Sequence, residues 1–243
     1  MTAFIALVFV LAGIVKGVIG MGLPTVAVAL LSMVMAPQEA AAILLVPSFV
    51  TNVVQLLAGP RLSHLLRRFA PLVLGIFAGT WGAALLGIGQ SASIGTFILG
   101  AALVTYAVLG LRNMTFSLGG RAERALSIPA GALTGVITAA TGVFVLPAVP
   151  FLQALGLEKD DLVQALGICF TASTIALGLA LAGTGSLQVA TGALSMLAVI
   201  PAVAGMWLGQ LLRQRISAAL FRRWFFTGLL VIGVTFLGKF LLG

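Results

Sequence analysis

The chain has 243 residues, of which 61% are hydrophobic and 7% are charged, whereas soluble domains carry about 25% charged residues. So few charges exclude a soluble globular protein, and the length has room for about eight to ten membrane segments with short loops but not for a soluble domain. The formal net charge of +8 then indicates topology signals beside anionic lipid headgroups, and it argues against nucleic-acid binding because no soluble module is present to carry it.

Apolar runs predict ten membrane segments with one long polar break. In chain order the segments are residues 3–20, 22–36, 40–58, 69–89, 93–112, 126–140, 142–156, 160–182, 187–212 and 221–242. The first has no basic region or cleavage site, so we expect it to be retained in the membrane. The break, residues 113–125, is interpreted as a cytoplasmic linker between a first transmembrane repeat, residues 1–112, and a second, residues 126–243.

The two halves resemble each other in sequence. Residues 12–19 match residues 130–137, and the matches continue in the same order toward the end of each half. There, residues 79–81 correspond to residues 205–207. We infer an internal duplication, a pattern found in many transporters.

The second segment of each half is too short to cross a bilayer. Residues 22–36 and 142–156 would rise only about 22 Å as helices, against a hydrocarbon core of about 30 Å. We therefore expect each to form a broken or re-entrant pair with the segment before it, entering and leaving at one face. All lysines and arginines except Lys16 and Lys239 then lie on one side, which the positive-inside rule makes cytoplasmic, with both termini outside. One long span in place of each pair would divide the charges almost evenly.

An odd number of reversals per half makes the second half start on the opposite face from the first. The charges of equivalent loops agree, since the loop after residues 40–58 contains Arg61, Arg67 and Arg68 and the loop after residues 160–182 is uncharged. The predicted fold is an all-α, polytopic integral membrane protein of two inverted repeats, each with a broken or re-entrant helix pair and three transmembrane helices.

Lys16 is the one basic residue well inside an apolar segment, and no Asp or Glu lies in a predicted span to neutralise it. A lysine in the middle of a bilayer costs about 2.5 kcal/mol or more unless it faces a cavity or a partner. Two interpretations stay open. Lys16 either extends to the interface or bonds carbonyl groups freed at a broken helix, or it contacts an anionic substrate.

Two predicted helices have polar side chains at helical spacing. Hydrogen bonds between helices explain isolated Ser or Thr residues, but Asn52 and Gln55 need several partners each, which favours a lined cavity. Asn52 is equivalent to Thr174 across the predicted pseudo-two-fold axis, so we expect Asn52 to approach Ser173 and Thr174. The stripes consist of Ser48, Thr51, Asn52 and Gln55 in one helix and Gln164, Thr171, Ser173 and Thr174 in the other, and all except Ser48 are candidate substrate-binding residues.

Each half begins with a glycine-rich break that would end one half-helix and start another. The free N–H groups of such helix ends, near Thr25 and near residues 143–144, attract oxyanions without base chemistry. Gly-x-x-x-Gly pairs, such as Gly13 with Gly17, instead indicate close packing of helices. The candidate substrate site therefore also includes Gly20, Gly22 and Thr25 in the first half and Thr138, Thr141 and Gly142 in the second.

The residue types in the sequence do not indicate catalysis, a cofactor or a metal site. The single histidine, His64, is in a basic loop, and Ser173 has no His or Asp partner in the predicted spans. The single cysteine, Cys169, excludes an intramolecular disulfide. We expect transport instead, with a channel or a non-transporting assembly protein as alternatives. Paired broken helices favour a carrier that works by alternating access around a site near the midplane.

The order and duplication of these motifs resemble the TauE/SafE sulfite-exporter family of membrane permeases. The resemblance covers almost the whole chain and implies a permease of the bacterial inner membrane that exports a small anion such as sulfite, a sulfonate or a related organic anion. The particular anion, its coupling and the oligomeric state are left open. The motifs are Gly13, Gly17, Gly20 and Gly22, then Gly131, Gly135, Gly142 and Pro147, and finally Pro201, Gly205 and Gly209 followed by Arg213, Arg215, Arg222 and Arg223.

Overall fold

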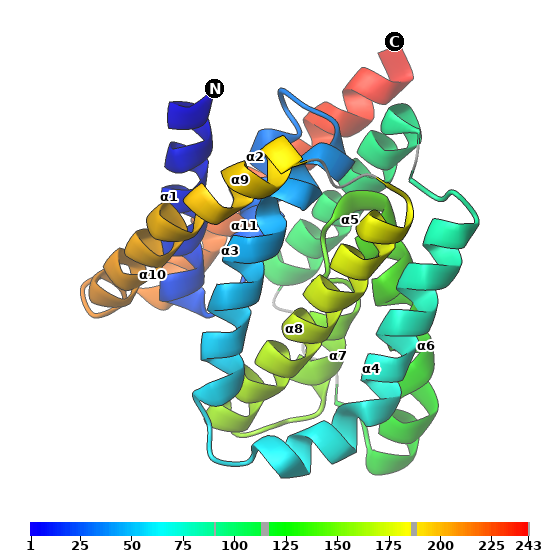
Figure 1. Cartoon of the computed structure of the whole chain (residues 1–243). Helices are drawn as coiled ribbons and strands as arrows, with labels where there is room; N and C mark the ends of the chain where they lie inside the picture. Colours follow the sequence, from blue (N-terminus) through cyan, green and yellow to red (C-terminus); the bar gives the residue numbers. More distant parts are fainter. Residues whose placement is uncertain (90, 113–116, 186–188, 243) are drawn as a thin grey trace.

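The computed structural model describes the chain except residues 90, 113–116, 186–188 and 243, and the first part of the predicted linker therefore lies outside the described residues. The described residues form helices and connecting segments without a strand (Figure 1). The helices are α1 (Thr2–Ile19), α2 (Leu23–Leu31), α3 (Pro37–Leu57), α4 (Leu62–Leu85), α5 (Ala92–Leu111), α6 (Gly120–Thr141), α7 (Ala148–Ala154), α8 (Lys159–Gly183), α9 (Val189–Leu197), α10 (Val199–Arg213) and α11 (Ala218–Leu242).

Within the described residues, seven helical stretches are long and apolar enough to cross a membrane. They are α1, α3, α4, α5, α8, the combined stretch Thr191–Arg213 and α11. The predicted class is therefore confirmed, because the chain is an all-α, multi-pass membrane protein. The 9-residue α2 and the 7-residue α7 rise only about 14 Å and about 11 Å as helices, less than half of a hydrocarbon core.

Both predicted glycine breaks are present. Helix α1 ends at Gly20 (φ 77°) and α6 ends at Gly142 (φ 74°), and each glycine has the left-handed conformation that closes a helix. Gly22, at φ 98°, then redirects the chain into α2. Because side chains other than glycine rarely adopt these angles, the positions of the breaks follow directly from the sequence.

The helix boundaries differ from the prediction in several places. Helices α2 and α7 are shorter than the predicted segments 22–36 and 142–156. Helices α4 and α6 begin earlier than predicted, at Leu62 and Gly120. The prediction missed their first turns because these turns are polar and lack the apolar signal of a span. The predicted segment 187–212 is two helices that meet at Ala198. Pro201 accounts for this break, since proline has no N–H to donate to the Leu197 carbonyl and its ring crowds that group.

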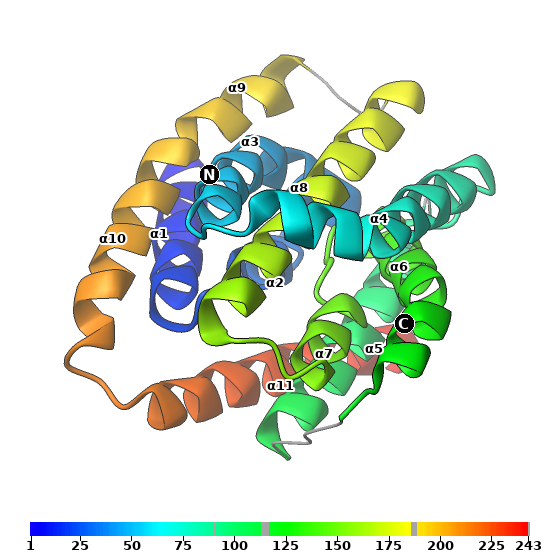
Figure 2. The same cartoon turned by 90° about the horizontal axis from the view of Figure 1, so that it is seen from below.

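The helices of the two halves pack in exchanged pairs (Figures 1 and 2). Helix α1 packs on α10 and α6 packs on α4, so the first helix of each half lies against the fourth segment of the other. The equivalent helices α3 and α8 pack on each other, as do α5 and α11. This pattern of contacts is the one that a pseudo-two-fold axis between the halves would generate. The opposite orientation of the halves in a bilayer stays a prediction.

The α1–α10 and α6–α4 pairs pack closely through glycine, as the Gly-x-x-x-Gly interpretation predicted. A Cβ atom added to Gly17 of α1 would lie 2.8 Å from Gly209 Cα of α10. A Cβ atom added to Gly135 of α6 would lie 2.9 Å from the Gly79 carbonyl carbon of α4. No side chain fits at such distances, so these glycines allow the helix backbones to approach closely.

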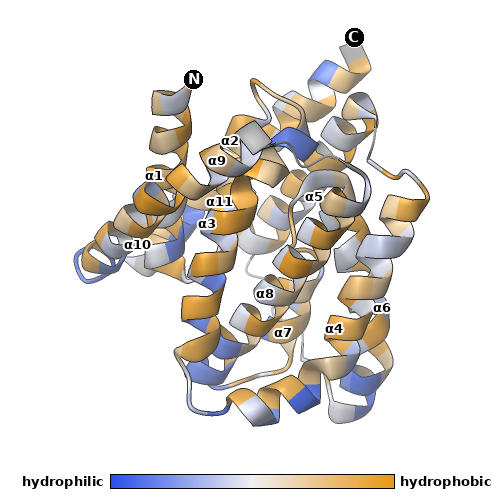
Figure 3. Cartoon of the chain, viewed as in Figure 1, coloured by the Kyte–Doolittle hydropathy of each residue, from blue (hydrophilic) through white to orange (hydrophobic). Residues whose placement is uncertain are grey.

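Both termini lie at one end of the bundle, whereas the α3–α4 and α7–α8 connections lie at the other (Figure 1). Hydrophilic residues gather at that second end (Figure 3). Two ion pairs link helices there: Arg68 of α4 bonds Glu123 of α6 at 2.6 and 2.8 Å, and Arg61 bonds Asp161 of α8 at 2.8 Å. The positive-inside rule predicts that this second end faces the cytoplasm.

We predict that residues 59–69, 111–125 and 213–223 face the cytoplasm. Cysteines introduced at exposed Ser63, Ser117 and Ser217 in a Cys169→Ala background should resist membrane-impermeant thiol reagents in intact cells, whereas Ser91→Cys at the opposite end should react. Labelling of Ser217→Cys from outside, with Ser63→Cys still protected, would show that the halves run parallel and would refute the inverted repeats.

Glycine packing on α4 provides a matched pair of substitutions. A Cβ atom at Gly79 would lie 2.7 Å from the Ala132 carbonyl carbon, whereas one at Gly82, a turn away, meets nothing within 4 Å. Gly79→Ala should therefore destabilise the protein by about 1–3 kcal/mol, as overpacking does, and Gly82→Ala should not. The measurement is the melting temperature in detergent. Equal melting temperatures for both variants would contradict the close packing of α4 on α6.

Candidate functional site

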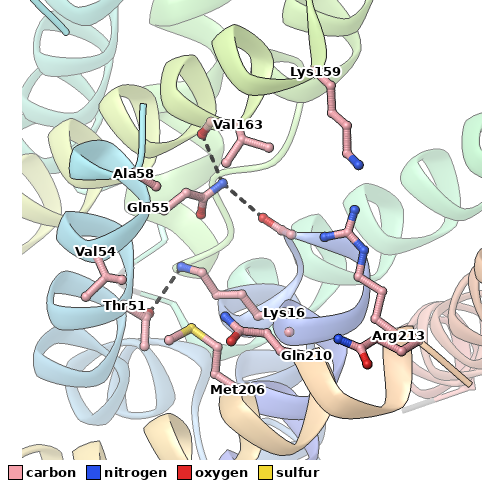
Figure 4. A pocket seen from close by; sticks show the side chains of 13 residues that line it. Lys16, Thr51, Val54, Gln55, Ala58, Lys159, Val163, Met206, Gln210 and Arg213 are labelled. Atoms are coloured by element: carbon pink, nitrogen blue, oxygen red, sulfur yellow. Dashed lines mark hydrogen bonds between the residues drawn. The ribbon is translucent and has the colours of Figure 1, made fainter. Parts of the chain in front are cut away.

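A cavity of about 590 Å³ lies between α1, α3, α10 and the start of α8 (Figure 4). Its volume is within the range of small-molecule sites. Exposed Lys159 and Arg213 lie at its rim and buried Lys16 lies inside it. The lining residues are Lys16, Gly17, Gly20, Thr51, Val54, Gln55, Ala58, Lys159, Val163, Met206, Gln210, Arg213 and Gln214. Among them are three cations and no carboxylate.

Lys16 is in the last turn of α1 and is 4% exposed. Its Nζ donates hydrogen bonds to Thr51 Oγ1 at 3.1 Å and to Asn52 Oδ1, both on α3. These partners are side chains, so Lys16 does not bond the carbonyl groups freed at the Gly20 break. No described Asp or Glu forms an ion pair with it. The Lys16 amine therefore lines the cavity without a resident counter-ion.

The hydrogen bonds around Asn52 have a defined direction. Thr174 Oγ1 donates to the Phe170 carbonyl at 2.7 Å, so it accepts from Asn52 Nδ2 at 3.2 Å. Asn52 Nδ2 also bonds Ser48 Oγ at 3.0 Å. With its amide donors used in this way, Asn52 presents its oxygen to Lys16. The predicted approach of Asn52 to Thr174 is confirmed by this contact between α3 and α8.

Thr51 is fixed as an acceptor for Lys16 in the same way. Its hydroxyl lies 2.8 Å from the Pro47 carbonyl and 3.2 Å from the Ser48 carbonyl, and both of these groups can only accept. The hydroxyl proton is thus directed along α3, and the oxygen lone pairs remain for Lys16. Two acceptors, Thr51 and Asn52, therefore hold the amine from one side.

Gln55 joins the first glycine break to α8. Its Nε2 donates to the Gly20 carbonyl at 3.0 Å and to the Val163 carbonyl at 3.1 Å (Figure 4). Gly20 and Gln55 both line the cavity, and Gln55 Oε1 has no described hydrogen-bond partner. The broken end of α1 is thereby fixed beside the cavity, with one amide oxygen left to accept a bond.

Gln164, predicted for the substrate site, lies outside this cavity. Its Nε2 donates to the Leu56 carbonyl at 2.9 Å and to the Gly59 carbonyl at 2.6 Å. Its Oε1 accepts from the Arg61 backbone N–H at 3.1 Å. Every polar atom of the amide is used on the α3–α4 turn, so the geometry makes Gln164 a cap for that turn.

The structure does not bring the second glycine break to this cavity. Thr138 donates to the Thr134 carbonyl at 2.7 Å, and Thr141 donates to the Ile137 carbonyl at 2.6 Å. Thr141 also accepts from the Val143 N–H at 3.1 Å, so that N–H is already satisfied. Of the other candidates, Asn52 and Thr174 lie behind Lys16 and do not line the cavity, contrary to the expectation for Asn52. Gly22, Thr25, Gly142, Thr171 and Ser173 do not line it either, and the buried hydroxyls of Thr25, Thr171 and Ser173 have no described partner.

Sequence reasoning missed the part of the site that α10 and the start of α8 contribute. Lys159 and Arg213 were interpreted only as topology signals, and Met206 and Gln210 were not considered. A signal was present, because Met206, Gln210, Arg213 and Gln214 share one helix face at spacings of three and four residues. Only the packing of α10 on α1 shows that this face lines a cavity.

Membrane-crossing helices around a basic, solvent-accessible cavity define a multi-pass membrane protein of the transporter type. The family model described as Sulfite exporter TauE/SafE matches residues 5–236, and the chain belongs to this family. The family consists of transporters and not of enzymes, in agreement with the absence of catalytic motifs from the sequence. Neither the search of curated proteins nor the search of solved structures found a match.

The role of Gln164 as a cap leads to a stability prediction. Gln164→Leu leaves two carbonyls and one N–H without their partner and should destabilise the protein by about 1–3 kcal/mol. Gln210→Leu is the matched control, because exposed Gln210 has no hydrogen bond that holds a turn. The measurement is the melting temperature of both variants in detergent. A Gln164→Leu variant as stable as the wild type would show that the turn does not depend on this amide.

Proposed function

We propose that the chain exports a small anion, such as sulfite, a sulfonate or a related organic anion, across the bacterial inner membrane. The observation that carries the proposal is the position of Lys16, a buried basic residue that lines a cavity without a resident carboxylate. A membrane-buried lysine costs about 2.5 kcal/mol or more unless it is compensated. A bound anion would supply the missing counter-ion, and the anion would be held where the helices can move it.

The cavity rim supports the same choice of substrate charge. Lys159 and Arg213 are exposed and lie on the path to Lys16 (Figure 4). Basic groups at the mouth of a low-dielectric cavity raise the local concentration of anions and repel cations. No carboxylate lines the cavity, and Asp161 of α8 is bonded to Arg61 at 2.8 Å. The charged side chains that line the cavity are therefore all basic.

The shape of the site favours a carrier over a channel. The exposed rim of the cavity includes Lys159 and Arg213, two of the basic residues that we expect on the cytoplasmic side. Beyond Lys16, the buried residues Ser48, Asn52 and Thr174 join α3 to α8 by hydrogen bonds. Access from one side only is what alternating access requires, with the termini outside and the two repeats inverted.

Flux in proteoliposomes tests this function directly. Purified protein should move radioactive sulfite, methanesulfonate or acetate with saturable kinetics, and unlabelled anion on the opposite side should accelerate the flux. Flux that rises linearly with concentration and shows no counter-stimulation would indicate a channel. No flux above that of empty liposomes for any of the three anions would refute the proposed function.

Lys16→Met tests the role of the buried cation. Methionine keeps much of the apolar stem but removes the charge, so packing should change little. Loss of a charge-assisted hydrogen bond of about 1.5–3 kcal/mol should raise the half-saturation concentration for sulfite about ten- to hundredfold. Lys239→Met, which removes an exposed lysine near the C-terminus, is the control at matched protein incorporation. An unchanged half-saturation concentration and maximal rate for Lys16→Met would assign Lys16 a structural role only.

A further inference from the structure

We propose that Lys16 takes up one proton when an anion binds and releases it when the anion leaves, so that each anion crosses the membrane together with a proton. The inference rests on the proposed function and names the coupling ion of the same site. It is carried by the number and the direction of the hydrogen bonds around Nζ, by the burial of Lys16 and by the charges that face it.

The two acceptors of Lys16 match the hydrogen atoms of a neutral amine. Thr51 Oγ1 and Asn52 Oδ1 each accept one bond from Nζ, and the other bonds of both side chains fix them as acceptors. An uncharged –NH2 group has two hydrogen atoms, and both are satisfied. A charged –NH3⁺ group has a third, for which the described residues provide no acceptor. That third N–H has the cavity before it, where an anion can accept it.

The surroundings of Lys16 lack any group that would keep the empty site charged. Helix α2 has no titratable side chain, and the only acidic residue of α3, Glu39, is 13 positions before Asn52, about 20 Å along the helix. Helix α10 contributes only Arg213, and α11 contributes Arg222, Arg223 and Lys239. On α8, Lys159 lines the cavity, Asp160 is exposed, Asp161 bonds Arg61 and Cys169 is buried.

This set of neighbours makes the charge of Lys16 depend on the substrate. Burial disfavours any charge without a partner, and no described Asp or Glu forms an ion pair with Lys16. Lysine, unlike arginine, loses its proton readily in such a place. A bound anion reverses the balance, because it accepts the third N–H bond and supplies the opposite charge.

The resulting cycle balances in atoms and charge. From the cytoplasmic side, an anion and a proton enter the cavity, and the lone pair of Nζ forms the new N–H bond. The occupied site is then neutral, and it can be enclosed without burying net charge. On the other side the anion leaves, the N–H bond breaks and the proton goes to water. The empty site returns as the neutral amine, with both hydrogens on Thr51 and Asn52.

The coupling predicts how flux responds to voltage. For the hydrogen sulfite monoanion, co-export with a proton moves no net charge, so a valinomycin–potassium potential should leave net efflux from wild-type proteoliposomes unchanged. A permanently charged Lys16 would instead return empty as a cation, and an inside-negative potential would accelerate net efflux. Acceleration of wild-type efflux by the potential would overturn the proposal. Absence of saturable sulfite flux at any voltage would instead refute the proposed function.

Lys16→Arg separates binding from proton release. Arginine keeps the positive charge but does not lose its proton, so the variant should retain measurable exchange of sulfite for sulfite while net efflux falls about tenfold or more. Net efflux of Lys16→Arg at the wild-type rate would overturn the proposal. If Lys16→Arg supports neither exchange nor net efflux, arginine does not fit the site. The voltage response of the wild type then decides whether the proposal holds.

The protonation of the empty site is also measurable without any transported ligand. Formaldehyde with a mild reductant methylates neutral amines, and mass spectrometry distinguishes Lys16 from the only other lysines, Lys159 and Lys239. At neutral pH and in anion-poor buffer, Lys16 should be methylated more readily than exposed Lys159, despite its burial. Added methanesulfonate, an anion that does not react with formaldehyde, should slow the reaction at Lys16 alone. A Lys16 that reacts only at the alkaline pH at which Lys159 reacts would show that the empty site is charged and would overturn the proposal.

Discussion

Inside a bilayer no water is available for free backbone groups, and this constraint governs the places where the helices are broken. At the first break the Gly20 carbonyl accepts from Gln55, and at the second the Val143 N–H donates to Thr141. Each interruption thus has a polar side chain assigned to it. The free backbone groups at each break require a polar partner, which explains why these side chains are buried. Their hydrogen bonds in turn allow the helix to be interrupted there.

The two breaks have diverged in use although the helices around them pack in equivalent pairs. In the sequence alignment of the halves, Lys16 corresponds to Thr134. Thr134 Oγ1 accepts from the Ala148 N–H at 3.1 Å, so the second half uses this position to bind its own short helix. In the first half the same position carries an amine that faces α3 and a cavity. A duplication has thereby produced one closed break and one that is open to solutes.

Much of the fold was predictable, because its signals are local. A left-handed turn selects glycine, so Gly20 and Gly142 mark the breaks, and glycine spacing marks the close helix pairs. Lys16, Thr51, Asn52 and Gln55 were predictable because polar residues are rare in spans. Gln164 met the same criterion but serves a turn, and Arg213 was hidden among topology charges. Those distinctions depend on which helix packs beside which, and the sequence pattern carries that information only indirectly.

The single amine at position 16 has a consequence for stoichiometry. Most duplicated carriers present two related half-sites, and a ligand that bridged them would contact both repeats on equal terms. Here the second half contributes through Thr174 and Val163 as a support for the residues that hold the amine, and the corresponding Thr134 has no charge. Under the proposed function, one chain therefore offers one buried lysine as a binding position for an anion. Occupancy should follow a simple hyperbola in anion concentration, so any sigmoidal behaviour would have to arise between chains and not within one.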